Sequence, residues 1–297
     1  MKIYAIIVTY NGKKWYNKCI GSLMMSSVPI DLVVVDNAST DGTIEYLSLN
    51  FPSLYIIRNR SNLGFAEANN IGIKYAMDKG ADYIFLLNQD AWVEYDTIKI
   101  LLKTFSDNEH VGIASPMHLN GEYTKLDKGF CNYIGSECIS DAYMNILKPY
   151  YSVPFVNAAA WLISKTCIYK VGGFDTCLFK HYGEDDNYAQ RVYYHGLKII
   201  INTQCTICHD REARKIDPAQ SLFNMDDSYF EERYYKGNIL LKYDSDSTIQ
   251  NKKIALIKSY LGLHFKRIKR IKRDLEFETK VSYSRKINKQ GGLAWLS

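Results

Sequence analysis

The chain has 297 residues, of which 47% are hydrophobic and 13% aromatic, so it can bury a sizeable core as one large domain or two smaller ones. This composition excludes a disordered, linker-rich or collagen-like protein. The formal net charge is +5. No apolar run approaches the roughly 18 residues that a membrane-spanning helix needs, so we do not expect an integral membrane protein.

The beginning of the chain and its cysteines favour a cytosolic protein. The first apolar run is too short for a secretory signal and ends in polar residues, as a first strand does. Seven scattered cysteines, an odd number, argue against a disulfide framework. The string Cys205–His209 matches a c-type haem attachment pattern, but that alternative needs an exported protein and an axial partner, and its apolar flank favours a strand.

The first 115 residues alternate between two apolar periods. Short β-branched or aromatic runs, typical of strands buried on both faces, occupy residues 2–10, 31–37, 54–59, 83–90 and 111–116. Helical periodicity fills residues 13–27, 40–51, 64–80 and 96–105. This alternation predicts an α/β fold with a doubly wound, mainly parallel sheet, helices on both faces and right-handed crossovers.

Polar residues follow these strands at the point where each strand ends. In open parallel sheets, ligands bind beyond the carboxyl ends of the strands, so we expect these residues to converge on one cleft. They are residues 9–11, residues 36–42, residues 58–59 and residues 88–90. Asp36 can accept from a base N–H or a ribose hydroxyl, although an Asx turn followed by a helix N-cap explains the same letters.

The second half of the chain has a weaker pattern. Residues 116–154 show no clear period and are interpreted as a long excursion over the sheet. Order returns with a strand at 155–164, a short helix closed by Gly172 and Gly173, a helix that opens on carboxylates after residue 182, and a strand at 197–209.

A basic amphipathic helix is predicted over residues 254–277. Its apolar positions recur at helical spacing and are Ile257, Leu261, Phe265, Ile268, Ile271 and Leu275, with six Lys and Arg residues among them from 266 to 273. This pattern favours peripheral contact with an anionic membrane through residues 252–275, with a solvated helix packed on its own domain as the alternative. No nucleic-acid recognition motif accompanies the basic stretch, so we expect no nucleic-acid partner.

Six blocks of sequence then carry a family resemblance. The sequence has neither a P-loop nor a G-x-G-x-x-G after its first strand, so it supports neither an NTPase nor a dinucleotide dehydrogenase. IIVTYNG, VVVDNASTDGT, NRSNLGFAEANNIGI, FLLNQDAWV, VGGFD and GEDDNYAQR, in this order over roughly residues 2 to 210, resemble glycosyltransferase family 2. These are inverting enzymes with the GT-A fold. The blocks are most similar to the rhamnosyltransferase-like branch that builds bacterial surface polysaccharides.

The resemblance implies a nucleotide-diphosphate sugar donor and places its binding residues. The pocket residues it implies are Thr9, Tyr10, Asn11, Asp36, Asn37, Ser39, Asn62, Gly64, Phe65, Asn69, Asn88 and Gln89. Asp90 occupies the position of the aspartate that holds Mg²⁺ or Mn²⁺ against the pyrophosphate, and hard oxygen ligands suit both ions. Asn88 replaces the first aspartate of the usual D-x-D, which weakens the implied metal site. His209 is implied as a metal or pyrophosphate ligand, with a structural histidine as the alternative.

The implied acceptor side lies in the second half of the chain. Asp185 takes the position of the general base, with Glu184 beside it contacting the acceptor. Asp186 is an extra carboxylate, and Asn187 stands where the family has another aspartate, so the assignment could shift by one residue. Carboxylates that simply favour the helix dipole are the alternative. Asn157 and Trp161 are placed against sugar or acceptor, with a core role for Trp161 left open, and VGGFD is expected to shape the acceptor entrance.

The implied protein is an inverting enzyme that moves a sugar, from dTDP-rhamnose or a UDP-hexose, to a glycan or lipid-linked glycan at the inner face of the cell membrane. Residues 1–215 would form the GT-A domain, with a nucleotide-binding half (1–115) and an acceptor-binding half (116–215), and residues 216–297 a helical region. A non-catalytic sugar-nucleotide-binding homologue is the alternative, favoured by Asn88. A nucleotidyltransferase would need a Gly-rich loop after the first strand, which is missing.

Overall fold

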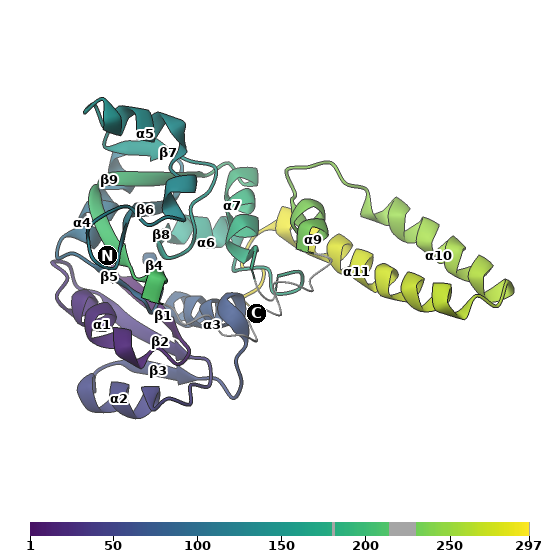
Figure 1. Ribbon diagram of the computed structural model, residues 1–297, viewed down its shortest axis with the longest axis horizontal. Helices are drawn as coiled ribbons and strands as arrows, with labels where there is room; N and C mark the ends of the chain where they lie inside the picture. The colour runs from purple at the N-terminus through teal and green to yellow at the C-terminus, as the bar shows by residue number, and fades with distance from the viewer. Residues whose placement is uncertain (180–181, 214–229, 297) are drawn as a thin grey trace.

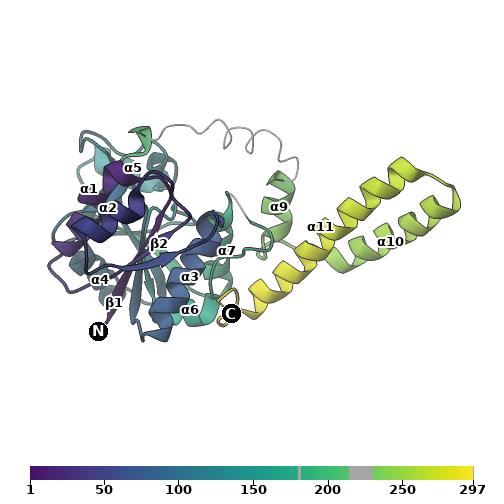
Figure 2. The ribbon, with the colours of Figure 1, turned by 90° about the horizontal axis from the view of Figure 1, so that it is seen from below.

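The computed structural model describes residues 1–179, 182–213 and 230–296. Within these residues nine strands form one sheet in the order β3-β2-β1-β4-β8-β6-β9-β5, with β7 paired to β9 outside this path (Figures 1 and 2). The strands are β1 (Ile3–Thr9), β2 (Asp31–Asp36), β3 (Tyr55–Arg58), β4 (Tyr83–Leu87), β5 (Ala91–Val93), β6 (Val111–Asn120), β7 (Tyr150–Ser152), β8 (Ala160–Ser164) and β9 (Lys198–His209). The α-helices are α1 (Tyr16–Met24), α2 (Thr43–Asn50), α3 (Gly64–Asp78), α4 (Thr97–Asp107), α5 (Gly135–Tyr143), α6 (Lys165–Val171), α7 (Glu184–Tyr194), α9 (Phe230–Gly237), α10 (Ser245–Leu261) and α11 (Phe265–Gln290).

The first half of the sheet is parallel, as the alternation predicts. β2 and β4 flank β1, and β3 continues beyond β2. Alternate side chains enter two cores: Ile6 and Val35 lie with α3, α6 and α7 on one face, and Ile7 and Val34 with α1, α2 and α4 on the other. Because both faces are covered, these strands read as continuous apolar runs.

The second half of the sheet is mixed. β8 runs antiparallel to both neighbours, β4 and β6. β9 pairs in parallel with β6 but antiparallel with β5 and β7. A loop rather than a helical crossover brings the chain from β7 to β8, so β8 is free to run against its neighbours.

The stretch without a clear period, residues 116–154, contains regular structure at the sheet. β6 continues to Asn120 through a register shift after Pro116. α5 follows, and β7 pairs with β9. The interpretation as an excursion over the sheet is therefore corrected: short elements broken by Gly and Tyr residues leave too little periodicity to read from the letters.

The C-terminal basic segment is a hairpin of two helices, so the single helix expected over 254–277 is wrong. α10 ends at Leu261, and α11 begins at Phe265 and runs back along it (Figure 1). Figures 1 and 2 show the hairpin projecting away from the sheet. The boundary expected between residues 215 and 216 lies outside the described residues. Among the helices that are described, none is both long and apolar enough to cross a membrane.

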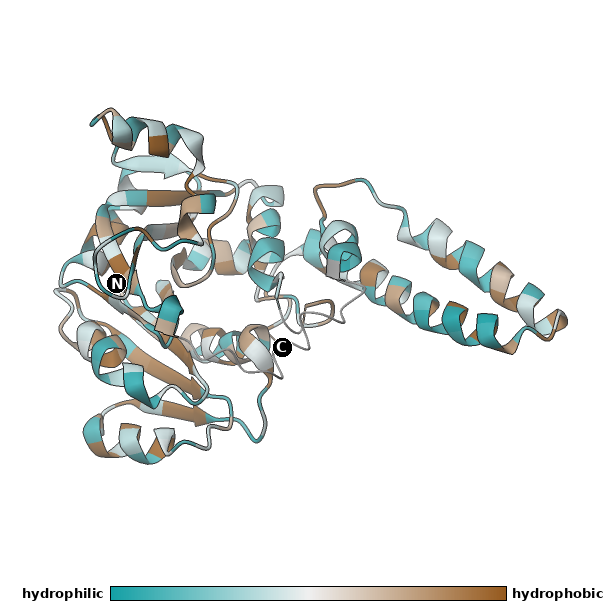
Figure 3. Ribbon diagram, viewed as in Figure 1, coloured by the Kyte–Doolittle hydropathy of each residue, from teal (hydrophilic) through white to brown (hydrophobic). Residues whose placement is uncertain are grey.

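The apolar stripe predicted for this segment is divided between buried and exposed positions. Figure 3 shows hydrophobic residues concentrated in the strands and hydrophilic ones along much of α11. Ile268 and Ile271 are buried in the hairpin, whereas Ile257, Leu261 and Phe265 are exposed. The six apolar positions therefore do not form one continuous membrane-facing stripe, because the bend separates them.

A buried polar network fixes α11 to the main domain. Asp175, fully buried, accepts backbone hydrogen bonds from Cys177 (3.0 Å) and Leu178 (3.1 Å) through Oδ1. Its Oδ2 accepts from the Ser284 hydroxyl and from Asn288 Nδ2 at 2.9 Å. Asp175 of the VGGFD block therefore anchors a helix, and the expectation that this block shapes the acceptor entrance stays a prediction.

The end of the chain also returns to the main domain. Gly173 N donates to the Ala294 carbonyl at 2.8 Å, and Leu296 is buried with the core residues on the α3 face of the sheet. At Gly172, which has φ of +84°, an added Cβ would lie 2.9 Å from the Gly292 carbonyl oxygen. This close approach explains why glycine follows α6.

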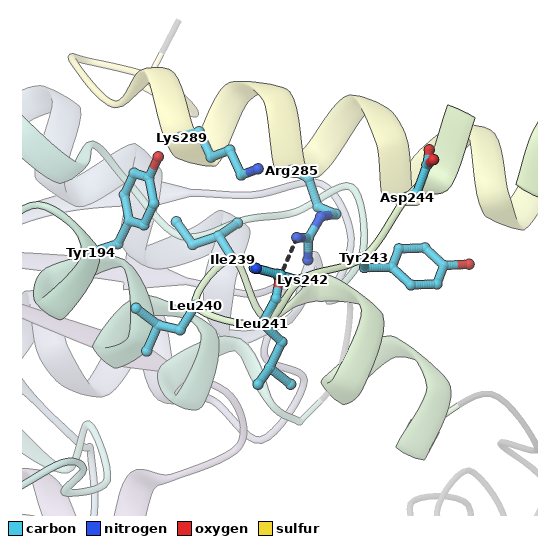
Figure 4. A pocket seen from close by; sticks show the side chains of 9 residues that line it. All are labelled: Tyr194, Ile239, Leu240, Leu241, Lys242, Tyr243, Asp244, Arg285 and Lys289. Atoms are coloured by element: carbon cyan, nitrogen blue, oxygen red, sulfur yellow. Dashed lines mark hydrogen bonds between the residues drawn. The ribbon is translucent and has the colours of Figure 1, made fainter. Parts of the chain in front are cut away.

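A shallow pocket lies where α11 passes α7 and the segment after α9 (Figure 4). Arg285 donates from its guanidinium to the carbonyls of Lys236 (2.9 Å), Asn238 (2.6 Å) and Leu241 (2.7 Å). Lys236 lies in the last turn of α9, whereas Asn238 and Leu241 follow the helix, so the guanidinium ties the end of α9 and the next segment to α11. This pocket lies apart from the strand ends.

Replacing Asp175 with alanine should lower the free energy of unfolding by at least about 3 kcal/mol, because four donors, three of them buried, would lose their acceptor. Asp246→Ala is the matched control: Asp246 accepts from Ser282 of α11 at 2.9 Å, but at an exposed position. Its loss should stay below about 1 kcal/mol. Urea unfolding of both variants measures the difference, and equal losses would contradict the anchoring role of Asp175.

Candidate active site

The carboxyl ends of β1 and β2 are joined directly. Thr9 is paired with Asp36 in the parallel register, and its hydroxyl donates to Asp36 Oδ1 at 3.1 Å. Asp36 Oδ2 accepts from the Ser39 N–H at 3.1 Å. A carboxylate has about four acceptor positions, so Asp36 keeps capacity for a ligand donor. The sequence prediction that these strand ends converge is confirmed.

The two loops after β1 and β2 hold each other. Asn11 N donates to Ser39 Oγ at 3.0 Å, and Thr40 N donates to Asn11 Oδ1 at 2.8 Å. Asn11 (φ +49°) and Ala38 (φ +63°) lie in the left-handed region, which costs energy for residues other than glycine and is found at functional sites. Tyr10 is left exposed above this pair of loops, where its ring can meet a base.

Gln89 connects the end of β4 to the end of β1. Its Oε1 accepts from the Tyr10 N–H at 3.0 Å, and its Nε2 donates to the Tyr10 carbonyl at 3.1 Å. Both halves of the amide are therefore engaged by backbone. Gln89 therefore holds the backbone of Tyr10 in place. The resemblance implies a further role for Gln89 in donor binding. A side chain at Gly12 would collide with this amide.

The remaining residues of the nucleotide half form a second clamp. Asn37 Nδ2 donates to the Gly64 carbonyl at 3.1 Å, and Asn62 Oδ1 accepts from the Gly64 N–H at 2.9 Å. Phe65 packs edge-on against Phe174, and Asn69 is buried on α3 with its Nδ2 bonded to the Phe65 carbonyl at 2.9 Å. These residues shape the loop at the start of α3, and among them Asn62 is exposed.

Asp90 and His209 meet beyond β4. Both are buried, and Asp90 Oδ1 lies 3.6 Å from His209 Nε2. The pairing of Ala91 with His209 and the hydrogen bond from Asp210 N to the Asp90 carbonyl (2.8 Å) fix this approach. The Asn88 amide lies 3.4 Å from the same imidazole nitrogen. The structure thus brings together the metal residues predicted from sequence.

Sequence reasoning missed two residues next to His209. Asp127, buried in the irregular stretch, lies with Oδ2 3.7 Å from His209 Nδ1. Arg211 Nε lies 3.8 Å from the same carboxylate oxygen. No motif marks Asp127. The only signal for Arg211 is its position two residues after His209. Asp127 lies on the Nδ1 side of the His209 ring, and Asp90 on the Nε2 side.

The carboxylates at the start of α7 lie in an environment that opposes their ionisation. Burial raises the pKa of Glu184 to about 8 and that of Asp186 to about 7, and the charge of Asp185 adds to both shifts. Burial also raises the pKa of Asp185, opposed by the backbone N–H groups of Asp186 and Ala158 and by the charge of Arg211. Clustered carboxylates with raised pKa values are typical of functional sites.

The loop before β8 links the two ends of the site. Ala158 N donates to Asp185 Oδ2 at 3.4 Å, and the neighbouring Ala159 carbonyl accepts from Asn88 N at 2.9 Å. Two consecutive residues therefore connect the start of α7 to the turn that carries Asp90. The acidic cluster and the turn of Asp90 are therefore tied to the same loop.

The two remaining acceptor residues have different environments. Asn157 is buried, and its Oδ1 has no hydrogen-bond partner within the described ranges. Trp161 is fully buried, stacks near Phe174 and donates from Nε1 to the Val156 carbonyl at 3.2 Å. The structure therefore places Trp161 in the core, which is the alternative that the sequence left open, and leaves Asn157 with a free acceptor atom.

Solved structures share this fold. The chain superposes on GalNAc-T7 with UDP, GalNAc and Mn²⁺ with a TM-score of 0.59 at 16% identity, over 80% of this chain and 50% of that one. It also superposes on the mannosyltransferase PcManGT from Pyrobaculum calidifontis in complex with GDP-Man and Mn²⁺, with a TM-score of 0.57 at 15% identity, over 97% and 86% of the two chains. The chain spans only half of the first protein. At these identities the likeness shows the fold, which is GT-A.

Sequence comparisons identify the family. The model of "Glycosyl transferase family 2" matches residues 4–172, more than half of the chain. The chain is 28% identical over 208 residues to the dTDP-rhamnosyl transferase RfbF of Shigella flexneri, covering 70% of this chain and 68% of that protein. It is 22% identical over 243 residues to the N-acetylglucosaminyl-diphospho-decaprenol L-rhamnosyltransferase of Mycobacterium tuberculosis, covering 73% and 79%. The chain therefore belongs to glycosyltransferase family 2 and is a glycosyltransferase with the GT-A fold.

Proposed function

We propose that this enzyme transfers a sugar from a nucleotide-diphosphate donor to a hydroxyl of a growing cell-surface glycan, with inversion at the anomeric carbon. The observation that carries the proposal is the link through Ala158 and Ala159, which ties the Asp185 carboxylate and the turn of Asp90 to one loop. A donor whose diphosphate lies at the strand ends would present its sugar to Asp185. In the single displacement that we propose, the base and the leaving group would lie on different sides of the sugar.

The donor half would bind the nucleotide at the ends of β1 and β2. Asp36 has acceptor capacity for a base or ribose donor, and Tyr10 offers an exposed ring beside it. Asn11 and Ser39 hold the two loops in the shape of this pocket. The internal clamps of Gln89 and Asn37 would pre-organise it, so little ordering is left for binding.

The residues around His209 fit a divalent cation. Asp90 and His209 supply an oxygen and a nitrogen at one buried point, with the Asn88 amide beside them. Across the described ranges, no cluster of three or more His, Cys, Asp or Glu residues is suited to a metal. The donor phosphates and water would complete the shell, as is usual for Mg²⁺ and Mn²⁺. The cation, when bound, would neutralise charge on the departing diphosphate.

Asp185 would act as the general base. The acceptor O–H bond breaks, its proton passes to the Asp185 carboxylate, and the acceptor oxygen forms the new bond to the anomeric carbon. The bond between that carbon and the phosphate oxygen breaks, and its electron pair leaves with the nucleoside diphosphate. Glu184, held neutral near pH 7 by its raised pKa, can donate a hydrogen bond to the acceptor, and Asn157 Oδ1 can accept one.

We propose dTDP-rhamnose as the leading donor, with UDP-hexoses behind it, and a lipid-linked glycan of a bacterial capsule or O-antigen as the acceptor. The names of the two rhamnosyltransferase relatives support this donor class, and one relative acts on a diphospho-decaprenol acceptor. Such an acceptor would place the enzyme peripherally at the inner face of the cell membrane. The basic residues between 252 and 275 support that location.

A non-catalytic sugar-nucleotide-binding homologue is the second candidate, favoured by Asn88 in place of an aspartate. The acidic cluster weighs against it. Burying Glu184 and Asp186 beside Asp185 opposes stability at neutral pH, and a protein that only binds a nucleotide sugar has no use for that cost.

Asp185→Asn should retain donor binding and lose acceptor-dependent transfer by about 10²–10⁴-fold, because the amide cannot take the proton. Release of nucleoside diphosphate from dTDP-rhamnose or a UDP-hexose with a glycan acceptor measures the rate. Asp186→Asn is the matched control and should cost less than about tenfold. Unchanged turnover in Asp185→Asn would remove it from the base role, and a larger loss in Asp186→Asn would move that role by one residue.

Glu184→Gln should stabilise the protein at about pH 8 more than at about pH 5. The unfolded glutamate ionises near its ordinary value of 4.5, whereas the folded one stays protonated up to about 8. The unfolded state therefore binds fewer protons between these values, and wild-type stability falls as the pH rises through them. Glutamine lacks this titration, so the gain should grow by about 1–3 kcal/mol across the range.

Urea unfolding at the two pH values tests this, with Glu122→Gln, an exposed glutamate, as the control that leaves the pH dependence unchanged. A gain from Glu184→Gln that is the same at both pH values would show that Glu184 is ionised in the folded enzyme at neutral pH.

A further inference from the structure

We propose that the bend of the α10–α11 hairpin, residues 260–267, inserts end-on into an anionic lipid surface and is the element that holds the enzyme at the membrane. We call these residues the hairpin bend. The proposal rests on the proposed function only for the lipid-linked nature of the acceptor, since binding to vesicles requires no sugar transfer. It replaces a helix lying flat on the membrane with a tip that enters it.

Every residue of the hairpin bend is exposed. The exposed fractions are 83% for Leu261, 71% for Leu263 and 73% for Phe265. Ile268 and Ile271, one turn further along α11, are buried within the hairpin. Three large apolar side chains at the end of a projection therefore remain uncovered by the rest of the described chain.

Leu263 of the hairpin bend has a backbone conformation that usually favours glycine. His264 N donates to the Ser259 carbonyl at 3.0 Å, and Leu263 N donates to the Tyr260 carbonyl at 3.1 Å, which is the Schellman pattern that ends a helix. Leu263 occupies the left-handed position of this pattern with φ of +56°. Glycine is favoured there, so a leucine adds apolar surface at the cost of backbone strain.

Positive charge surrounds the hairpin bend without local compensation in sequence. Between Asp246 and Asp274 the chain contains no Asp or Glu and nine Lys or Arg residues. They are Lys252, Lys253, Lys258, Lys266, Arg267, Lys269, Arg270, Lys272 and Arg273. Apolar side chains at a tip, with basic ones beside and behind them, match the depth profile of a membrane surface, where acyl chains lie below anionic headgroups.

The positive charge around the hairpin bend also favours one binding partner over another. A second copy of the chain docked tip to tip would bring two basic groups together without compensation, and like charges oppose that contact. A lipid surface that contains phosphatidylglycerol supplies both the apolar layer and the negative charge. The long Lys and Arg side chains can reach the headgroups while the helices stay above them.

The hairpin transmits this docking to the active site. α11 is fixed to the main domain through Ser284 and Asn288, which bond to Asp175. From Ser284 to Phe265 the helix rises about 29 Å, at about 1.5 Å per residue. Figures 1 and 2 show the hairpin leaving the domain beside α7 and α9, and α7 carries Asp185. The hairpin is thus a spacer that sets the orientation of the acceptor side relative to the lipid.

Vesicle flotation with the full-length protein tests the proposal. Wild type should bind phosphatidylglycerol vesicles and lose binding as salt is raised, while pure phosphatidylcholine vesicles should bind at least about tenfold less. Leu261→Ser with Leu263→Ser and Phe265→Ser should weaken binding at least about tenfold. Leu49→Ser, at an α2 residue that is 82% exposed, is the apolar control and should bind as wild type does.

A charge-reversed pair completes the design. Lys266→Glu with Arg267→Glu should weaken binding to anionic vesicles, whereas Lys286→Glu with Lys289→Glu, on the same helix near the domain, should change it little. All variants should keep wild-type unfolding and turnover of a water-soluble acceptor, so failure of the membrane proposal is separable from failure of the transferase proposal.

The insertion geometry has its own readout. Tryptophan fluorescence of Phe265→Trp should be quenched by brominated lipid tails, and that of Ile254→Trp on α10 should not. Equal quenching would indicate a flat hairpin and overturn end-on insertion. Wild-type binding by the triple serine variant would overturn the role of the bend, and so would concentration-dependent dimerisation abolished by the same substitutions without any vesicle binding.

Discussion

The site depends on one constraint, which is that strands β1, β2 and β4 end at the same edge of the sheet. Parallel register pairs Thr9 with Asp36 and sets Ile6 beside Leu86, so β1, β2 and β4 run out at the same edge of the sheet. The polar residues that follow then bond to one another across the strands, and Gln89 with its Tyr10 partner is the clearest case. Because those bonds are internal, the edge is shaped before any ligand arrives, and pre-organised polar groups lose less on binding and in the transition state.

This arrangement divides the polar residues into two kinds that look alike in the sequence. The side chains of Asn37, Gln89 and Asn62 form hydrogen bonds with backbone groups. Asp90, His209 and the carboxylates of α7 lie buried close to like or complementary groups, where a ligand changes their balance. Asn and Gln favour turns and strand ends for local reasons, so a family motif marks both kinds equally.

The sequence predicts the nucleotide half well because strands covered on both faces give continuous apolar runs, and helices between them give a different period. It predicts the acceptor half less well for physical reasons. The antiparallel direction of β8 depends on the loop that precedes it, and Asp127 and Arg211 reach His209 only through the fold. The break between α10 and α11 could not be predicted, because a single glycine such as Gly262 is tolerated within a helical pattern. The turn itself depends on the left-handed conformation of Leu263. The anchoring role of Asp175 could not be predicted, because no sequence pattern reveals that Ser284 and Asn288 return to it.

The most direct test is nucleotide binding at the strand ends, measured as the thermal shift with UDP, dTDP, GDP and CDP, each with and without Mn²⁺. One nucleotide at 100 times its Kd should add about 2.7 kcal/mol of apparent stability to the wild type in the presence of metal. Asp90→Ala should lose that metal-dependent response, and Asp82→Ala, just before the amino end of β4, should keep it. Stabilisation of Asp90→Ala equal to that of wild type, or no response to any nucleotide, would contradict a donor and metal site at this edge of the sheet.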